Sequence, residues 1–150
     1  MSGPGKERGV GNGELPAIDS LDELTALVER RPGLFLRYSK GPESDIGRPS
    51  VDYESGLPLP GLSATVLDAE CWWTSPLEDW LARQVCKYTH LAKEGDRRAW
   101  ILSGRVVARG PDHEPLIDEV EPVAWLDDSV VEQARQHYEK AFDVGRDSTG

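Results

Sequence analysis

One strand of the sequence carries a cation where an apolar residue is expected. In the stretch RRPGLFLRYSKGPESD, residues 31–46, apolar side chains surround Arg37, and Ser39 follows two positions later. Because side chains alternate between the two faces of a strand, Arg37 and Ser39 share a face. A buried guanidinium needs a partner of opposite charge. Arg37 therefore either binds a small anionic ligand or forms a structural ion pair, for which the candidates are Asp45, Glu70 and the DEVE carboxylates.

Helices flank this strand. In SLDELTALVER, Ser20 and Glu23 have the spacing of a capping box, and the RPG at 31–33 ends the helix. A second helix begins near TSP, with Thr74 or Ser75 as its cap and Pro76 at its first position. Its apolar face has Gln84 near the centre, so this amide must either brace a neighbouring segment or face a cleft.

The segment at 40–61 is rich in glycine and proline. Its sequence, KGPESDIGRPSVDYESGLPLPG, predicts neither a continuous helix nor a strand. A loop this long in a compact domain is usually functional. We expect it to cover a cleft whose floor carries Arg37, Ser39 and Ser63.

The rest of the chain alternates between strands and one more helix. AWILSGRVVARG predicts a strand or a hairpin bent at Ser103–Gly104, and LIDEVEPVAWL predicts another strand. Asp127 or Asp128 caps the last helix. The order predicts a single α+β domain with a mainly antiparallel sheet, about three helices and the long Pro/Gly-rich loop.

Length and charge limit the classes of function. The 150 residues suit one domain, which we place at 15–143, between a flexible tail at 1–14 and a frayed end at 144–150. The net charge of −10 argues against binding to nucleic acid by non-specific charge. No apolar run reaches the roughly 20 residues of a membrane helix, and no signal peptide is recognisable, so a cytoplasmic protein is expected.

Metal and thiol chemistry have little support in the sequence. Cys86 and His90 are four residues apart, which on a helix puts them on one face, as in some metal sites. A closed zinc site needs about four ligands, however, and the whole chain has just two cysteines and three histidines, which argues against a site built from Cys and His alone. We expect no metal, and Cys71 and Cys86 as free thiols. His113 lies in the turn GPDHEP, where it is either a base or a solvated turn residue.

Three stretches resemble a family of small actinomycete proteins of unknown function. They are RPGLFLRYSKGPESD, LPGLSA followed by WW, and ARGPDHEPL leading to EPVAWL. The resemblance covers residues from about Leu15 to Ala134. It implies no established activity.

A second resemblance, in the order of motifs, is to the ADP-ribosyltransferase fold. In that fold an early strand arginine anchors the dinucleotide, a Ser-x-Ser/Thr strand supports the nicotinamide-ribose pocket, and a late glutamate contacts the ribose. The resemblance implies NAD as substrate, with an arginine to clamp the pyrophosphate and a carboxylate to stabilise an oxocarbenium-like transition state. The implied catalytic residues are Glu119 and Glu121, and the implied ligand-binding residues are Arg37, Tyr38, Ser39, Ser63, Thr65 and Trp73.

Two other functions remain open. An acidic domain without catalysis can act as an interaction module for a basic partner or for a second copy, with an exposed apolar patch around Trp72 and Trp73. A tailoring enzyme acting on a small anionic metabolite would use Arg37 without NAD. An active site requires Arg37 and Glu121 to face one concave pocket, whereas an interaction module does not.

Overall fold

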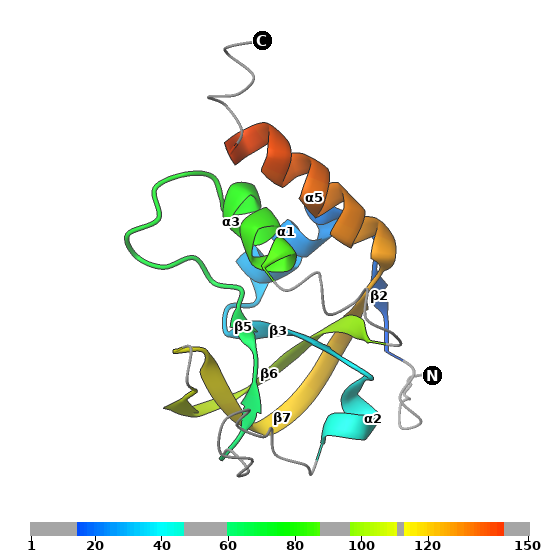
Figure 1. Cartoon of the computed structure of the whole chain (residues 1–150), viewed down its shortest axis with the longest axis vertical. Helices are drawn as coiled ribbons and strands as arrows, with labels where there is room; N and C mark the ends of the chain where they lie inside the picture. The colour runs from blue at the N-terminus through cyan, green and yellow to red at the C-terminus, as the bar shows by residue number, and fades with distance from the viewer. Residues whose placement is uncertain (1–14, 47–59, 88–96, 111–112, 143–150) are drawn as a thin grey trace.

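Three long helices lie to one side of a curled sheet in the computed structural model (Figure 1). The structure describes residues 15–46, 60–87, 97–110 and 113–142. The long helices are α1 (Leu21–Arg30), α3 (Leu77–Cys86) and α5 (Asp128–Phe142). The fourth described helix, α2 (Pro42–Asp45), is a single short turn that follows strand β3.

The sheet is mainly antiparallel, as predicted. Its order is β2-β7-β6-β3-β5, and β4 also pairs with β7. Only the pairing of β2 with β7 is parallel among the described strands. The strands are β2 (Ala17–Ile18), β3 (Leu34–Ser39), β4 (Leu62–Ser63), β5 (Thr65–Val66), β6 (Arg98–Arg109) and β7 (Pro115–Leu126).

The sheet curls back on itself through the adjacent strands β4 and β5. β5 pairs with β3, while β4, on the other side of Ala64, pairs with β7. The backbone N–H of Ala64 donates to the carbonyl of Pro115 at 3.1 Å and continues the pairing with β7. The strands β3, β6 and β7 and the β4–β5 segment therefore enclose a small interior.

The two faces of the sheet pack against different apolar clusters. The face under the helices includes Leu34, Leu36 and Tyr38 of β3 in a large cluster with α1, α3 and α5. The inner face of the curl holds a smaller cluster formed by Phe35, Leu62, Ala64, Trp100, Leu102 and Ile117. Alternation along β3 therefore places Arg37 on the inner face, next to the smaller cluster.

Side chains at the helix ends satisfy backbone groups and join elements. The Ser20 hydroxyl accepts from the N–H of Glu23 at 3.1 Å, and the Glu23 carboxylate accepts from the N–H of Asp19 rather than from that of Ser20. Asp127 caps α5 by accepting from the N–H of Ser129 at 3.0 Å. These contacts confirm the predicted starts of α1 and α5.

One local prediction was wrong: α3 begins after Pro76, and neither Thr74 nor Ser75 caps it, because Pro76 itself holds the N-cap position without a side-chain bond. Of the two alternatives for AWILSGRVVARG, the strand is confirmed: β6 is continuous, and the irregularity near Ser103–Gly104 is a shift of register against β7. In the described part of the segment at 40–61, residues 42–45 form the single turn of α2, since Pro42 suits a first helical position.

The remaining predictions about segments fall partly outside the described residues. The expected tail at 1–14, the residues 47–59 of the Pro/Gly-rich loop and the end at 144–150 lie outside them. In the part that is described, no helix combines the length and apolar character needed to span a membrane.

Candidate functional site

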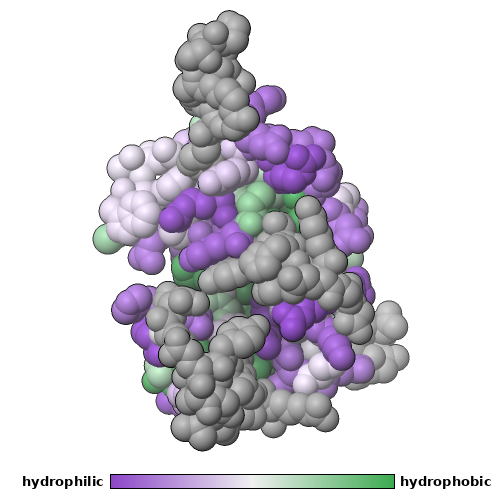
Figure 2. Space-filling view, in the orientation of Figure 1, coloured by the Kyte–Doolittle hydropathy of each residue, from purple (hydrophilic) through white to green (hydrophobic). Residues whose placement is uncertain are grey.

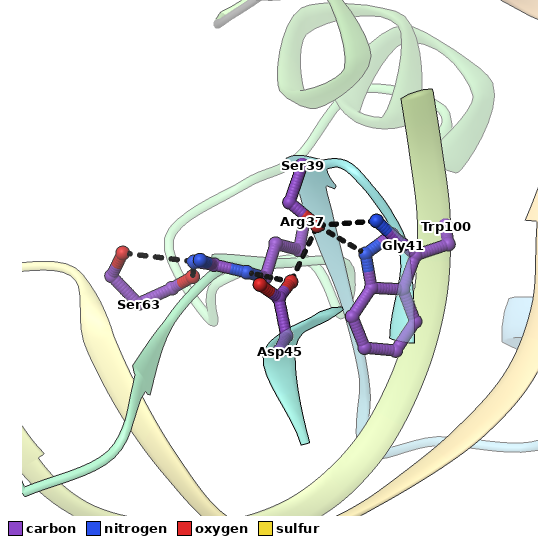
Figure 3. Close-up of polar contacts among 6 residues, drawn as sticks. All are labelled: Arg37, Ser39, Gly41, Asp45, Ser63 and Trp100. Atoms are coloured by element: carbon purple, nitrogen blue, oxygen red, sulfur yellow. Dashed lines mark hydrogen bonds and ion pairs between the residues drawn. The ribbon is translucent and has the colours of Figure 1, made fainter. Parts of the chain in front are cut away.

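Arg37 is the centre of a polar network on the inner face of the sheet (Figure 3). Its Nε donates to Asp45 Oδ2 at 2.7 Å, and both side chains are largely buried, with exposed fractions of 17% and 12%. Its Nη1 donates to the carbonyl of Ser63 at 2.7 Å and lies 3.3 Å from the Ser63 hydroxyl. Arg37 thus joins β3 to α2 and to β4, as a structural ion pair does.

Ser39 is fully engaged in the same network. Its hydroxyl donates to Asp45, and it accepts from the backbone N–H of Gly41 at 3.1 Å and from Trp100 Nε1 at 2.9 Å. A hydroxyl has one hydrogen to donate and two lone pairs to accept with, so these bonds use its whole capacity. Ser39 therefore acts as a structural hub between β3, α2 and β6.

Two other predicted ligand-binding residues lie on the helix side of the sheet. Tyr38 is buried among the residues under α3, and its hydroxyl donates to the carbonyl of Val85 at 2.8 Å. Burial raises the pKa of this hydroxyl above its ordinary value, so Tyr38 stays neutral. Thr65 is also buried, opposite Leu36 in the pairing of β5 with β3. Neither side chain shares the inner face with Arg37.

The two predicted catalytic glutamates lie on an exposed part of β7. Glu121 pairs with Ser103 of β6, which in turn pairs with Leu34, a residue of the helix side. Its carboxylate is 75% exposed and 3.9 Å from the guanidinium of Arg31. It therefore faces away from the inner face that carries Arg37.

Glu119 belongs to an irregular stretch of the hairpin. Its φ is 53°, a left-handed conformation that a non-glycine residue adopts mainly at bulges and turns. Its exposed carboxylate is 3.9 Å from Arg105. The structure therefore brings Arg37, Ser39 and Ser63 together and places Glu119 elsewhere.

Tryptophans 72, 73 and 80 form a second cluster, at the start of α3. The rings of Trp73 and Trp80 are 5.1 Å apart, and that of Trp72 is 6.0 Å from Trp73 and 5.8 Å from Trp80, all edge-to-face. The guanidinium of Arg83 lies over the three rings at 5.9, 5.9 and 5.1 Å. We call the outer part of this cluster, Trp72, Trp73 and Arg83, the indole surface.

The indole surface projects outward from a buried base. Trp80 is 2% exposed, whereas Trp72 is 60% exposed, the highest value among the described large apolar residues. The loop between β5 and α3 that carries Trp72 extends away from the body in Figure 1, and Figure 2 shows residues of near-neutral hydropathy on that side of a mostly hydrophilic face. Trp73 donates from Nε1 to the carbonyl of Pro76 at 3.2 Å, so it helps to fix the loop.

The remaining candidates occupy structural or solvated positions. Gln84 braces β5, because its amide donates to the carbonyl of Val66 at 2.7 Å. Neither Cys71 nor Cys86 is in a disulfide, as predicted, and burial raises the pKa of the Cys86 thiol. His113 is exposed in its turn, with a φ of 66°. Among the described residues, no group of three or more His, Cys, Asp or Glu side chains is arranged to hold a metal.

The sequence did not indicate two members of the Arg37 network. Trp100 binds Ser39 across 61 positions of the chain, and no local spacing predicts that contact. The second is the backbone N–H of Gly41, which donates to the Ser39 hydroxyl. The φ of Gly41 there is 128°, a conformation that suits glycine. Asp45, by contrast, was among the predicted partners of Arg37.

The model of one known protein family matches almost the whole chain. The model of the DUF6098 family, described as a family of unknown function, matches residues 11–149 of the 150. The chain belongs to the DUF6098 family. Neither the search of curated proteins nor that of solved structures found a match to it.

Membership in the DUF6098 family implies no activity for the chain. In this DUF6098 chain, Arg37 Nη2 has no hydrogen-bond partner among the described residues, which leaves it as a donor for an anionic group. The indole surface offers apolar rings beside a guanidinium. Both are candidate places for binding another molecule.

Proposed function

We propose that this DUF6098 protein is a non-catalytic interaction module that binds a protein partner through the indole surface. The observation that supports this proposal is the 60% exposure of Trp72 above a fixed aromatic base. Tryptophan and arginine are the residues most enriched among those that dominate binding energy at protein interfaces. A contiguous exposed apolar patch marks an interaction site more often than a lone exposed residue does, and the Trp72 ring is continuous with those of Trp73 and Trp80.

The arrangement of the catalytic candidates also favours binding over catalysis. A transferase would need a carboxylate at the anchored ribose, and Glu121 faces away from Arg37. Arg37 and Ser39 already have partners that explain their positions in the fold. The polar network around Arg37 therefore serves to stabilise the fold that carries the indole surface.

Site-specific photo-crosslinking in the natural host tests this proposal. A photoreactive phenylalanine derivative at position 72 keeps an aromatic ring in the surface, and one at the exposed position 107 of β6 is the matched control. We expect a discrete adduct from position 72 that is absent at position 107 and reduced by Arg83→Gln. Equal labelling from both positions would contradict the proposal.

A second candidate function is the binding of NAD or a similar anionic nucleotide at Arg37. One observation favours it: Arg37 Nη2, on a largely buried side chain, has no hydrogen-bond partner among the described residues. A free N–H of a guanidinium can donate to a phosphate oxygen. ADP-ribosyl transfer would require, beyond this binding, that the carboxylate of Glu119 or Glu121 reach the nucleotide, although Glu121 faces away from Arg37.

Calorimetric titration with NAD tests the second candidate. Binding should appear in the wild type and disappear in Arg37→Ala, once circular dichroism shows that the variant is folded. Arg98→Gln removes an arginine that instead stacks on Trp125 at 3.9 Å, and it should leave the binding unchanged. If folded wild type shows no heat of binding, the nucleotide function is excluded.

A further inference from the structure

We propose that the partner of the indole surface is an extended, proline-rich protein segment with a carboxylate next to its prolines. This inference rests on the proposed function and names the chemical class of the partner. It follows from the kinds of polar group that the surface presents and from how firmly its rings are held.

The indole surface presents hydrogen-bond donors. Within the described ranges, the indole N–H of Trp72 has no acceptor, and the guanidinium of Arg83 has neither an ion pair nor a hydrogen bond. Both groups can only donate. A partner rich in hydrogen-bond acceptors therefore complements this surface.

A proline-rich segment has this character. Proline lacks a backbone N–H, so each proline contributes a carbonyl acceptor and an apolar ring. Such segments adopt the extended polyproline conformation before binding, which lowers the entropy lost on docking, and aromatic-lined surfaces are their usual receptors. The rings would pack on Trp72 while the carbonyls accept from its indole N–H.

The positive charge of Arg83 favours an acidic residue next to the prolines of the partner. Arg83 has no ion-pair partner among the described residues, in a chain whose net charge is −10. A carboxylate on the partner would pair with it, whereas a lysine would be repelled by it locally. The attraction acts at the contact, because the charge of the whole chain repels an acidic partner at long range.

The base of the surface is pre-organised for such a ligand. Trp80 is buried and donates from Nε1 to the carbonyl of Leu67 at 3.1 Å, and Trp73 donates to Pro76. Little freedom of the Trp73 and Trp80 side chains is therefore left to lose when a ligand binds, so the entropy lost comes mainly from Trp72 and Arg83.

Nuclear magnetic resonance of the full ¹⁵N-labelled chain tests the inference. The indole N–H signals are recorded while acetyl-PPPDPPP-amide is added, and Trp72→Phe identifies the signal of Trp72. We expect saturable shifts of that signal and an affinity about tenfold weaker in Arg83→Gln, the loss expected for one charged contact of about 1.4 kcal/mol.

Matched controls separate the parts of the argument. PPPKPPP should bind at least about tenfold more weakly than PPPDPPP if the carboxylate pairs with Arg83. GSGDGSG should not bind if the prolines are needed. The variant Arg98→Gln, which removes a guanidinium from the ring of Trp125, should bind like the wild type.

The outcomes distinguish this inference from the proposed function. If PPPDPPP leaves the Trp72 signal unmoved while the position-72 crosslink persists, the partner class is wrong and the interaction module stands. If that signal shifts with protein concentration alone, the surface binds a second copy, which also overturns the inference. If both the titration and the crosslink fail, both proposals fall.

Discussion

A single serine explains much of the order on the inner face of the sheet. The Ser39 hydroxyl accepts from Trp100 and Gly41 and donates to Asp45, and Asp45 in turn holds Arg37. Trp100 is fully buried, so its indole N–H has no access to water and depends on this acceptor. The hydroxyl therefore matters for folding whatever Arg37 binds.

Removing the Ser39 hydroxyl should destabilise the fold strongly for the loss of a single atom. We predict that Ser39→Ala lowers the free energy of unfolding by about 3 kcal/mol, because two buried donors lose their acceptor at about 1–3 kcal/mol each. Urea unfolding followed by circular dichroism measures the loss. Ser103→Ala, whose hydroxyl is 3.5 Å from Glu121 at an exposed site, should change stability little. Equal losses in the two variants would show that Ser39 is not a hub.

Hydrogen bonds between residues close in the sequence set the ends of individual helices. Asp127 accepts from the hydroxyl of Ser129 at 2.7 Å and from its backbone N–H at 3.0 Å. These bonds lower the pKa of Asp127 below its ordinary value of 3.8, with the hydroxyl bond as the main cause. The cap is therefore an ionised carboxylate at neutral pH, at the positive end of the α5 dipole.

The cap of α5 should make stability depend on pH in acid. Since the pKa is lower in the folded state, the contribution is fully present above 3.8 and is lost as the pH falls through the folded-state value. Asp127→Asn keeps a capping oxygen but does not titrate, so we predict a shallower fall of the melting temperature in this acid range. Thermal unfolding of both proteins across that range measures it; parallel curves would contradict the assignment.

The molecule as a whole is closed by the segment that contains β4 and β5. This segment joins β3 to β7, and Gly61 precedes it in close contact with the backbone of Ile117. A Cβ at Gly61 would lie 2.7 Å from the Ile117 carbonyl oxygen, which belongs to backbone and cannot move aside cheaply. Closure of the curl thus depends on a residue without a side chain.

We predict that Gly61→Ala opens the junction between β4 and β7. Hydrogen exchange of the Ala64 N–H, which donates to Pro115, should accelerate by at least about tenfold, equivalent to about 1.4 kcal/mol of local stability. Gly33→Ala is the control: its φ of 89° adds strain of about 1–3 kcal/mol, but no atom lies within 4 Å of the added carbon. Unchanged exchange at Ala64 in Gly61→Ala would contradict this account of closure.

Local signals in the sequence predicted most of the elements. The capping residues Ser20 and Asp127, the alternating strand that contains Arg37, and the α+β class all depend on contacts between near neighbours in the chain. Such contacts have fixed spacings, so a sequence shows them directly. The structural ion pair of Arg37 with Asp45 was also within reach, because the two residues are eight positions apart.

Only the tertiary structure decided which polar residues meet. The partner of Ser39, Trp100, comes from β6, and the position of Glu121 across the sheet follows from the register of β6 against β7. A change of one residue in register moves a side chain to the other face, and the shifts in this hairpin have no local signature. The sequence by itself determined the elements and the cation at Arg37; folding determined that this cation joins a scaffold and that Trp72 faces outward.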